Sequence, residues 1–236
     1  MKWMFAKCNS AIVEIVILLA IGIGAQAQQP DLAALMAGMA ANGAQLRQYT
    51  FKQRTEAYYK DELKNVRVDE VHYSLAGERV SIPLEEQKEQ PQQPPRPLRL
   101  HPAARLVSNR IERKQAEIKD YVERLLSLAG RYLSPEQAKL QAALANAQIS
   151  LPAGGAEVRI SLLGFIKPGD SLTMSFDSAT RRPTRSEART SLDDKPVTIA
   201  VTFDAVHSGP NYPARIVVTL DSEQLEVRML TYDYRL

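Results

Sequence analysis

The chain has 236 residues, 44% of them hydrophobic and 24% charged, and a formal net charge of +3 at pH 7. This length suffices for one domain with a sizeable core, and the charge is too balanced to predict a nucleic-acid partner. Cys8 is the single cysteine, so the sequence excludes a disulfide framework and a thiolate metal site.

The first 27 residues have the layout of a secretory signal peptide. Lys2 and Lys7 form a short positive region, an apolar run covers residues 15–24, and Ala25-Gln26-Ala27 is a small-x-small cleavage pattern. The apolar run is about half of the roughly 20 residues that a membrane-spanning helix needs. We therefore predict cleavage after Ala27, with an uncleaved N-terminal anchor as the alternative.

The mature chain is then predicted to be residues 28–236, a single exported domain in the periplasm or outside the cell. Cys8 precedes the apolar run, so it cannot be the cysteine of a lipid anchor, and no permanent membrane anchor is expected after cleavage.

The N-terminal part of the mature chain predicts a short helix and then strands. Apolar residues at helical spacing over residues 31–42 indicate an amphipathic helix. From Tyr49 the period changes to two, which predicts a hairpin that turns near residues 60–65 and returns over residues 66–75. A third, shorter strand is expected over residues 79–84.

A polar segment and a helical section follow. Residues 85–102 are rich in Glu, Gln and Pro and cannot bury a core, so we predict a solvated connector. Helical spacing resumes at about residue 106 and continues to Gly130. Ser134-Pro135-Glu136 is typical of the start of a second helix, which ends before Pro152.

The last third of the chain alternates apolar and polar residues between turn sequences. This repeated alternation indicates an antiparallel meander with one apolar face and one solvent-exposed face. The apolar face needs a cover, and the helices at 31–42 and 106–147 can supply it. The fold class is therefore α+β: a strongly curved antiparallel sheet with helices over its concave apolar face. The predicted strands are centred on residues 158–162, 172–176, 184–191, 197–203, 216–220 and 225–229.

No residue set indicates catalysis, so we expect a protein that is not an enzyme and has no cofactor. His72, His101 and His207 have no spacing typical of metal ligands, and no nucleophile, zinc or phosphate-loop motif occurs. Asp193-Asp194 precedes Lys195-Pro196, a setting typical of a surface turn rather than of a carboxylate pair for acid–base chemistry.

Arginines are clustered at two places in the sequence. They are compatible with anionic lipid head groups or an acidic partner, but interleaved glutamates make a solvated surface the simpler interpretation. The first cluster is Arg96, Arg99, Arg105, Arg110 and Arg113, and the second is Arg181, Arg182, Arg185 and Arg189.

The order of elements, together with the tract from Phe176 to Pro183, resembles the periplasmic LolA/LolB-like lipoprotein-carrier superfamily. The tract is a strand that enters an Asp-containing turn, and Thr- and Val-rich strands follow it to the C-terminus. The resemblance implies an open half-barrel whose hydrophobic concave surface is closed by helices and accepts acyl chains. The Pro/Gln connector and the long central helix are larger than in that layout.

Two hypotheses for function follow, and a secreted enzyme with a cleft assembled from distant segments is a third. In the first, the protein is a carrier or sensor that holds a lipid or acyl chain. In the second, it is an envelope scaffold with a filled core, which binds an envelope protein through its long helix or connector. The candidate ligand-binding residues of the first hypothesis are Tyr49, Phe51, Tyr59, Leu172, Met174, Phe176, Val201 and Phe203.

Overall fold

The computed structural model describes residues 32–74, 76–88, 102–133, 137–152, 154–207 and 209–236. The predicted signal peptide, its cleavage site and His101 lie outside the described residues. The helices are α1 (Leu32–Leu46), α2 (Pro102–Leu133), α3 (Gln137–Leu144) and the short 3-10 helix η1 (Asp221–Glu223). The strands are β1 (Thr50–Tyr59), β2 (Glu62–Tyr73), β3 (Arg79–Lys88), β4 (Gln148–Ser150), β5 (Glu157–Leu163), β6 (Ser171–Asp177), β7 (Pro183–Leu192), β8 (Lys195–Ala205), β9 (Asn211–Leu220) and β10 (Leu225–Arg235).

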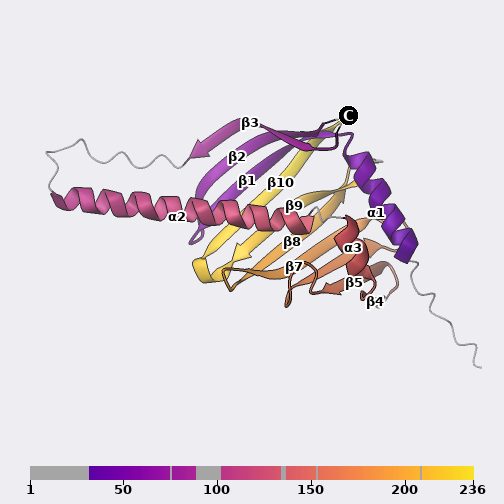
Figure 1. Ribbon diagram of the computed structural model, residues 1–236. Coiled ribbons are helices and arrows are strands. Elements are labelled where there is room, and N and C mark those ends of the chain that lie inside the picture. Colours follow the sequence, from indigo (N-terminus) through magenta and orange to yellow (C-terminus); the bar gives the residue numbers. More distant parts are fainter. Residues whose placement is uncertain (1–31, 75, 89–101, 134–136, 153, 208) are drawn as a thin grey trace, which may run out of the picture.

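The strands form one antiparallel sheet in the order β3-β2-β1-β10-β9-β8-β7-β6-β5-β4. The sheet is strongly curved but not closed, because β3 and β4 are its two edges. Helix α2 crosses the concave side, and α1 and α3 lie at one end of it (Figure 1). This confirms the predicted fold class, an α+β open half-barrel with helices over the concave face.

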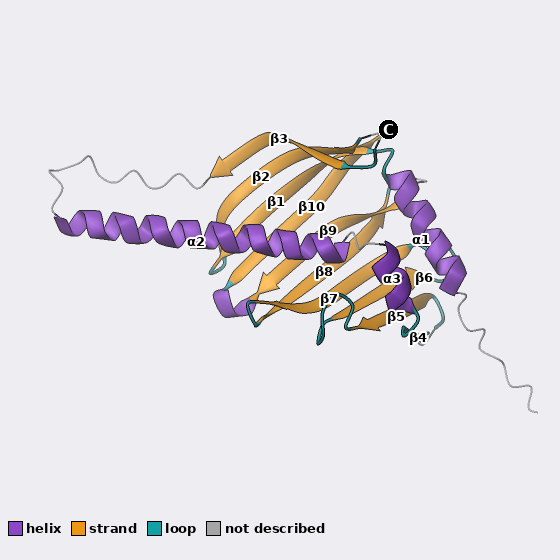
Figure 2. Cartoon of the chain, in the orientation of Figure 1, coloured by secondary structure: helices purple, strands orange, loops and turns teal. Residues whose placement is uncertain are grey.

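Side chains of strands β5–β10 alternate between the two faces as predicted. Cross-strand partners such as Ile160 and Met174, or Val201 and Ile216, point to the same side of the sheet. Their apolar side chains form one buried core with the C-terminal half of α2 and with α1 and α3. Figure 2 shows the helices in purple against the orange strands of the sheet. Burial of this face is the main force that holds the helices on the sheet.

Several element boundaries differ from the prediction, and one short strand was not predicted. Strand β3 continues to Lys88 rather than ending at residue 84, because Glu85–Lys88 pair with Val68–Asn65 of β2. Backbone pairing at a sheet edge tolerates polar side chains, so composition did not mark this end. Strand β4 has only three residues, too few for a periodic signal, and α2 begins at Pro102, where proline suits the first helical position.

Helix α1 is attached to the sheet by a reciprocal pair of hydrogen bonds. The Asn42 side-chain amide donates to the Asn211 carbonyl at 2.8 Å, and the Asn211 backbone N–H donates to the Asn42 Oδ1 at 2.7 Å. Gly38 allows α1 to approach the β6–β7 turn closely, because a Cβ at this position would lie 3.1 Å from the Cβ of Arg181. The two contacts place α1 across the ends of β6, β7 and β9.

The C-terminal end of α2 is held by a buried carboxylate. Tyr132 donates a hydrogen bond of 2.6 Å to Asp170 Oδ2 in the β5–β6 loop, which also accepts the backbone N–H groups of Ile166 and Lys167 at 3.0 Å. Burial and the bond to Asp170 raise the pKa of Tyr132 to about 12. Because both side chains are buried, removal of either partner deprives the other of a hydrogen bond that water cannot replace.

We predict that Tyr132→Phe lowers the free energy of unfolding by about 1–3 kcal/mol, because it leaves the Asp170 carboxylate buried with one partner fewer. Urea denaturation followed by circular dichroism measures this change. Tyr232→Phe is the matched control, since Tyr232 lies on the outer face of the sheet with 41% of its surface exposed. Equal unfolding midpoints for the two variants would contradict the anchoring role of Tyr132.

Candidate functional site

The candidate site is the concave face of the half-barrel, and its central wall is filled. Leu172, Met174, Phe176 and Val201 are 1%, 8%, 1% and 3% exposed. They pack in one core with apolar side chains of the three helices. Four of the eight candidate ligand-binding residues are therefore covered by helical side chains. The covering residues that are themselves buried are Leu35, Leu125, Leu128, Ala129, Tyr132, Leu140 and Leu144.

Two more candidates lie at the border of this core. Tyr59 and Phe203 are only partly buried and pack against it. Apolar side chains of α2 have the same intermediate exposure, and all belong to the stripe that the helix turns toward the sheet. Six of the eight candidates thus belong to one continuous apolar surface. The partly exposed α2 residues are Ile118, Tyr121, Val122, Leu126 and Leu133.

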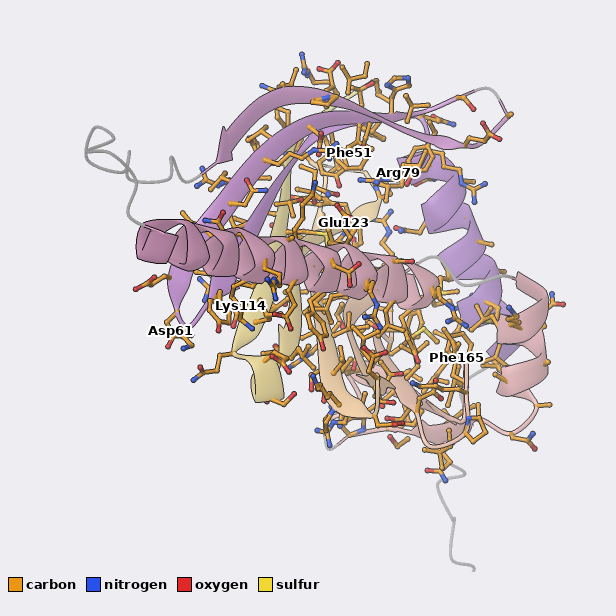
Figure 3. The ribbon with its side chains drawn as sticks, turned by 60° about the vertical axis from the view of Figure 1, so that its left-hand side comes forward. Phe51, Asp61, Arg79, Lys114, Glu123 and Phe165 are labelled. Carbon is orange, nitrogen blue, oxygen red and sulfur yellow. The ribbon has the colours of Figure 1, made fainter. Side chains whose placement is uncertain are left out.

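The remaining two candidates, Tyr49 and Phe51, belong to a separate aromatic cluster. Phe51 stacks on Tyr234 with ring centroids 4.7 Å apart, and Tyr49 and Tyr212 contact the same ring at 6.2 and 4.2 Å. Burial raises the pKa of Tyr234. In Figure 3, Phe51 lies on the hairpin side of α2, whereas Phe165 lies on the other side among the core residues. Sequence alternation did not indicate Tyr212 or Tyr234, which stand near strand ends beside bulges or turns.

The inner face of the N-terminal hairpin is largely polar, unlike that of β5–β10. Register places Gln53 opposite Asp69 and Thr55 opposite Arg67, on the same side as Phe51 and Ala57. Arg67 pairs with the buried Asp69 at 2.8 Å, and Arg79 donates to Gln53 at 2.8 Å. The concave surface therefore changes from apolar to polar between β10 and β2.

Helix α2 is fastened by polar contacts to the part of the sheet that includes the β7–β8 turn. Arg124 forms an ion pair with Asp193 of that turn, which is a tight turn with positive φ at both Asp193 and Asp194. Lys195 donates to the Tyr121 hydroxyl at 2.9 Å and forms an ion pair with Glu223. With Tyr132 and Asp170, these contacts join α2 to the chain between β5 and β8. The predicted turn at Asp193-Asp194 is thus confirmed.

Charge pairing shifts the pKa values of these groups. The hydrogen bond from Lys195 lowers the pKa of Glu223, and that from Arg124 lowers the pKa of Asp193. The bond to Glu223, and after it the bond to Tyr121, raises the pKa of Lys195. All of these groups are at the surface, so solvent screens the interactions and their contribution to stability is small.

The described ranges hold neither a cluster of metal ligands nor an apolar helix of membrane-spanning length. No group of three or more His, Cys, Asp or Glu side chains is placed there to hold a metal ion. His72 lies in β2, and His207 lies after β8. None of the described helices is both long and apolar enough to span a membrane.

Comparisons with known proteins give one structural match. No family model matches the chain, and no curated protein matches it. Among solved structures, a LolA superfamily protein from Nitrosomonas europaea matches with a TM-score of 0.39 and 12% sequence identity, over 86% of this chain and 92% of the other.

We predict that Lys195→Met removes a pH-dependent part of the stability. A carboxyl group whose pKa is lower in the folded than in the unfolded state stabilises the fold above its ordinary value, here 4.5 for Glu223, and this contribution is lost as the pH falls through the folded-state pKa. The melting temperature of the variant should therefore lie below that of the wild type at pH 7, and the difference should shrink below pH 4.5.

Thermal melts between neutral and acidic pH measure this difference. Lys119→Met serves as the control, because Lys119 forms an exposed i,i+4 pair with Glu123 within α2 and has no such contact to the sheet. A difference between wild type and Lys195→Met that stays constant with pH would contradict the assigned pairing.

Proposed function

We propose that the protein is a non-catalytic carrier or sensor of the cell envelope that holds a lipid or acyl chain between the concave sheet and α2. The observation that carries this proposal is the continuous apolar surface of the concave face, buried beneath α2 at its centre and partly exposed at its border. A hydrophobic chain can make the same contacts with that surface as the leucines of α2 make. Sites for such ligands are mostly apolar, with few polar groups.

The fastening of α2 favours entry from one side. Its hydrogen bonds to Asp170, Asp193 and Lys195 hold it toward β5–β8. On the other side, toward β10 and β1, Tyr59 is only partly buried, and the Lys114 ammonium of α2 lies 5.9 Å from the centre of its ring. An acyl chain that enters there displaces half-buried side chains first and leaves the buried Tyr132–Asp170 anchor in place.

The polar inner face of the hairpin suits the head group of an amphipathic ligand. Arg67 lies on β2, next to β1, whose Tyr59 already borders the apolar core. Arg79 lies on β3, and its side chain reaches over β2 to donate to Gln53 of β1. A lipid whose chain lies against Tyr59 and Phe203 then has hydrogen-bond donors within reach of its polar end. We therefore infer an amphipathic ligand rather than a plain hydrocarbon.

An envelope scaffold remains the second candidate, and a specific observation favours it. Leu172 and Phe176 are each 1% exposed beneath the helices, as expected of a filled core that serves stability alone. In that case the partner is a protein of the envelope. Export itself is proposed from the signal-peptide pattern of the first 27 residues.

Native mass spectrometry and lipid extraction on protein purified from the periplasm distinguish the two functions. We expect a bound mass in the range of an acyl lipid on the wild type. Phe203→Glu should remove it, because a charge at the border of the core is incompatible with a hydrocarbon neighbour. Circular dichroism should show that this variant stays folded, since Phe203 is only partly buried.

Leu230→Glu is the matched control, because Leu230 is 36% exposed and lies on the outer face of β10. It should retain the bound mass. The carrier function would be excluded, and the scaffold function favoured, by two results together. The wild type would carry no bound lipid, and Phe203→Glu would only lower the melting temperature.

A further inference from the structure

The convex face of the sheet carries a row of arginines that the chain order does not reveal. Direct cross-strand pairing connects Arg159 to Ser175, Ser175 to Arg185, Arg185 to Thr202, and Thr202 to Arg215. The row continues through Leu230 to Arg54. Direct partners point to the same face, and adjacent residues such as Val158, Ile160 and Ile216 point into the core. The arginines therefore project outward, away from the helices, about 9–10 Å apart on alternate strands.

The centre of this row is not neutralised. At its ends, Arg159 lies 3.5 Å from Glu157 and Arg54 lies 2.6 Å from Glu56. Glu187, which shares the outer face of β7 with Arg185, is paired with Arg189 at 3.0 Å. Arg185 and Arg215 are exposed and have no carboxylate within ion-pair distance among the described residues. The two guanidinium groups thus flank the exposed Thr202 hydroxyl with their charge available.

An open furrow runs beside Arg185 on the same face. Its floor consists of the short side chains of β6, and its walls are taller side chains of β5 and β7. Its volume is about 470 Å³, within the range of roughly 300–1,000 Å³ that is usual for small-ligand sites. Arginines and hydroxyl groups are the donors that recognise phosphate. The hydroxyl groups of the floor belong to Ser171, Thr173 and Ser175, and the arginines of the walls are Arg159, Arg185 and Arg189. Glu187, which pairs with Arg189, also lines the furrow.

We propose that this arginine row docks the protein on a membrane surface of anionic phospholipids, with Arg185 and Arg215 binding lipid phosphates. An acidic protein partner is a poorer fit, because protein interfaces are centred on buried aromatic and apolar anchors. The row alternates arginine mostly with Ser and Thr and offers no aromatic anchor. A fluid lipid surface can arrange its phosphates to match evenly spaced guanidinium groups. The proposal does not depend on a ligand in the concave face.

Flotation of the full protein with vesicles tests this docking. Wild type should bind vesicles of phosphatidylcholine containing a minority of phosphatidylglycerol, bind pure phosphatidylcholine vesicles weakly, and be released by added salt. The affinity of the double variant Arg185→Gln/Arg215→Gln for the anionic vesicles should fall by roughly tenfold or more. The variant Arg185→Lys/Arg215→Lys should retain much of the binding, because it keeps both positive charges.

Arg113→Gln/Arg131→Gln is the matched control, since it removes two exposed positive charges from α2, on the other side of the sheet. Equal vesicle binding by the two Gln variants, or no preference of the wild type for anionic vesicles, would overturn the proposal. Lipid retained in the concave face, measured by native mass spectrometry, should be the same in the Arg185→Gln/Arg215→Gln variant and the wild type. Loss of docking and loss of the carrier function are therefore separate outcomes.

Discussion

The rest of this structure depends on the register of one antiparallel sheet. Because side chains alternate between faces with a period of two, a shift of the strand pairing by one residue would move all apolar side chains of a strand to the solvent-exposed face. Pairing from β4 to β3 keeps the apolar side chains of β5–β10 on one face. Bulges such as those between Ser175 and Phe176 and between Thr202 and Phe203 add local twist and bend. A sheet bent in this way with one apolar face has to be covered, and α2 supplies the cover.

Apolar packing, more than polar contact, holds α2 in place. A fully buried leucine such as Leu125 contributes about 1.5–3 kcal/mol, whereas an exposed ion pair such as Arg124–Asp193 contributes about 0–1 kcal/mol. The polar contacts therefore set the position of the helix and the apolar stripe supplies most of its binding energy. A cover held mainly by hydrophobic contact can be replaced in part by a hydrophobic chain with a small net change in free energy. This property connects the filled core with the proposed carrier function.

Periodicity in the sequence is sufficient to predict the meander, from alternation with a period of two, and the covering helices, from helical spacing. Both patterns are encoded within short windows, and together they predict the fold class. Leu172, Met174, Phe176 and Val201 were placed on the concave face for the same reason. The end of β3 and the existence of β4 could not be predicted, since both depend on edge pairing rather than on composition. Whether a buried wall is a core or a cavity also lies beyond periodicity, because both require the same alternation.

The positions of the arginines also depend on strand pairing rather than on sequence proximity. The arginines of the second cluster lie close together in the sequence but have different environments in the fold. They are Arg181, Arg182, Arg185 and Arg189. Arg182 donates to the Gly209 carbonyl, Arg189 pairs with Glu187, and only Arg185 joins the unpaired centre of the convex row. Its companion Arg215 is far away in the chain and becomes a neighbour only through the pairing of β7, β8 and β9.

Curvature gives the two faces opposite properties. On the concave side, side chains converge, so Phe176, Ile199 and Leu125 fill the space between sheet and helix. On the convex side they diverge, so arginines on alternate strands stand about 9–10 Å apart or more. This spacing is close to the Debye length of about 8 Å at physiological ionic strength, at which mutual repulsion is largely screened. The same bend that closes the core therefore lets a row of like charges persist on the outside without a carboxylate for each, and leaves those charges available to an anionic surface.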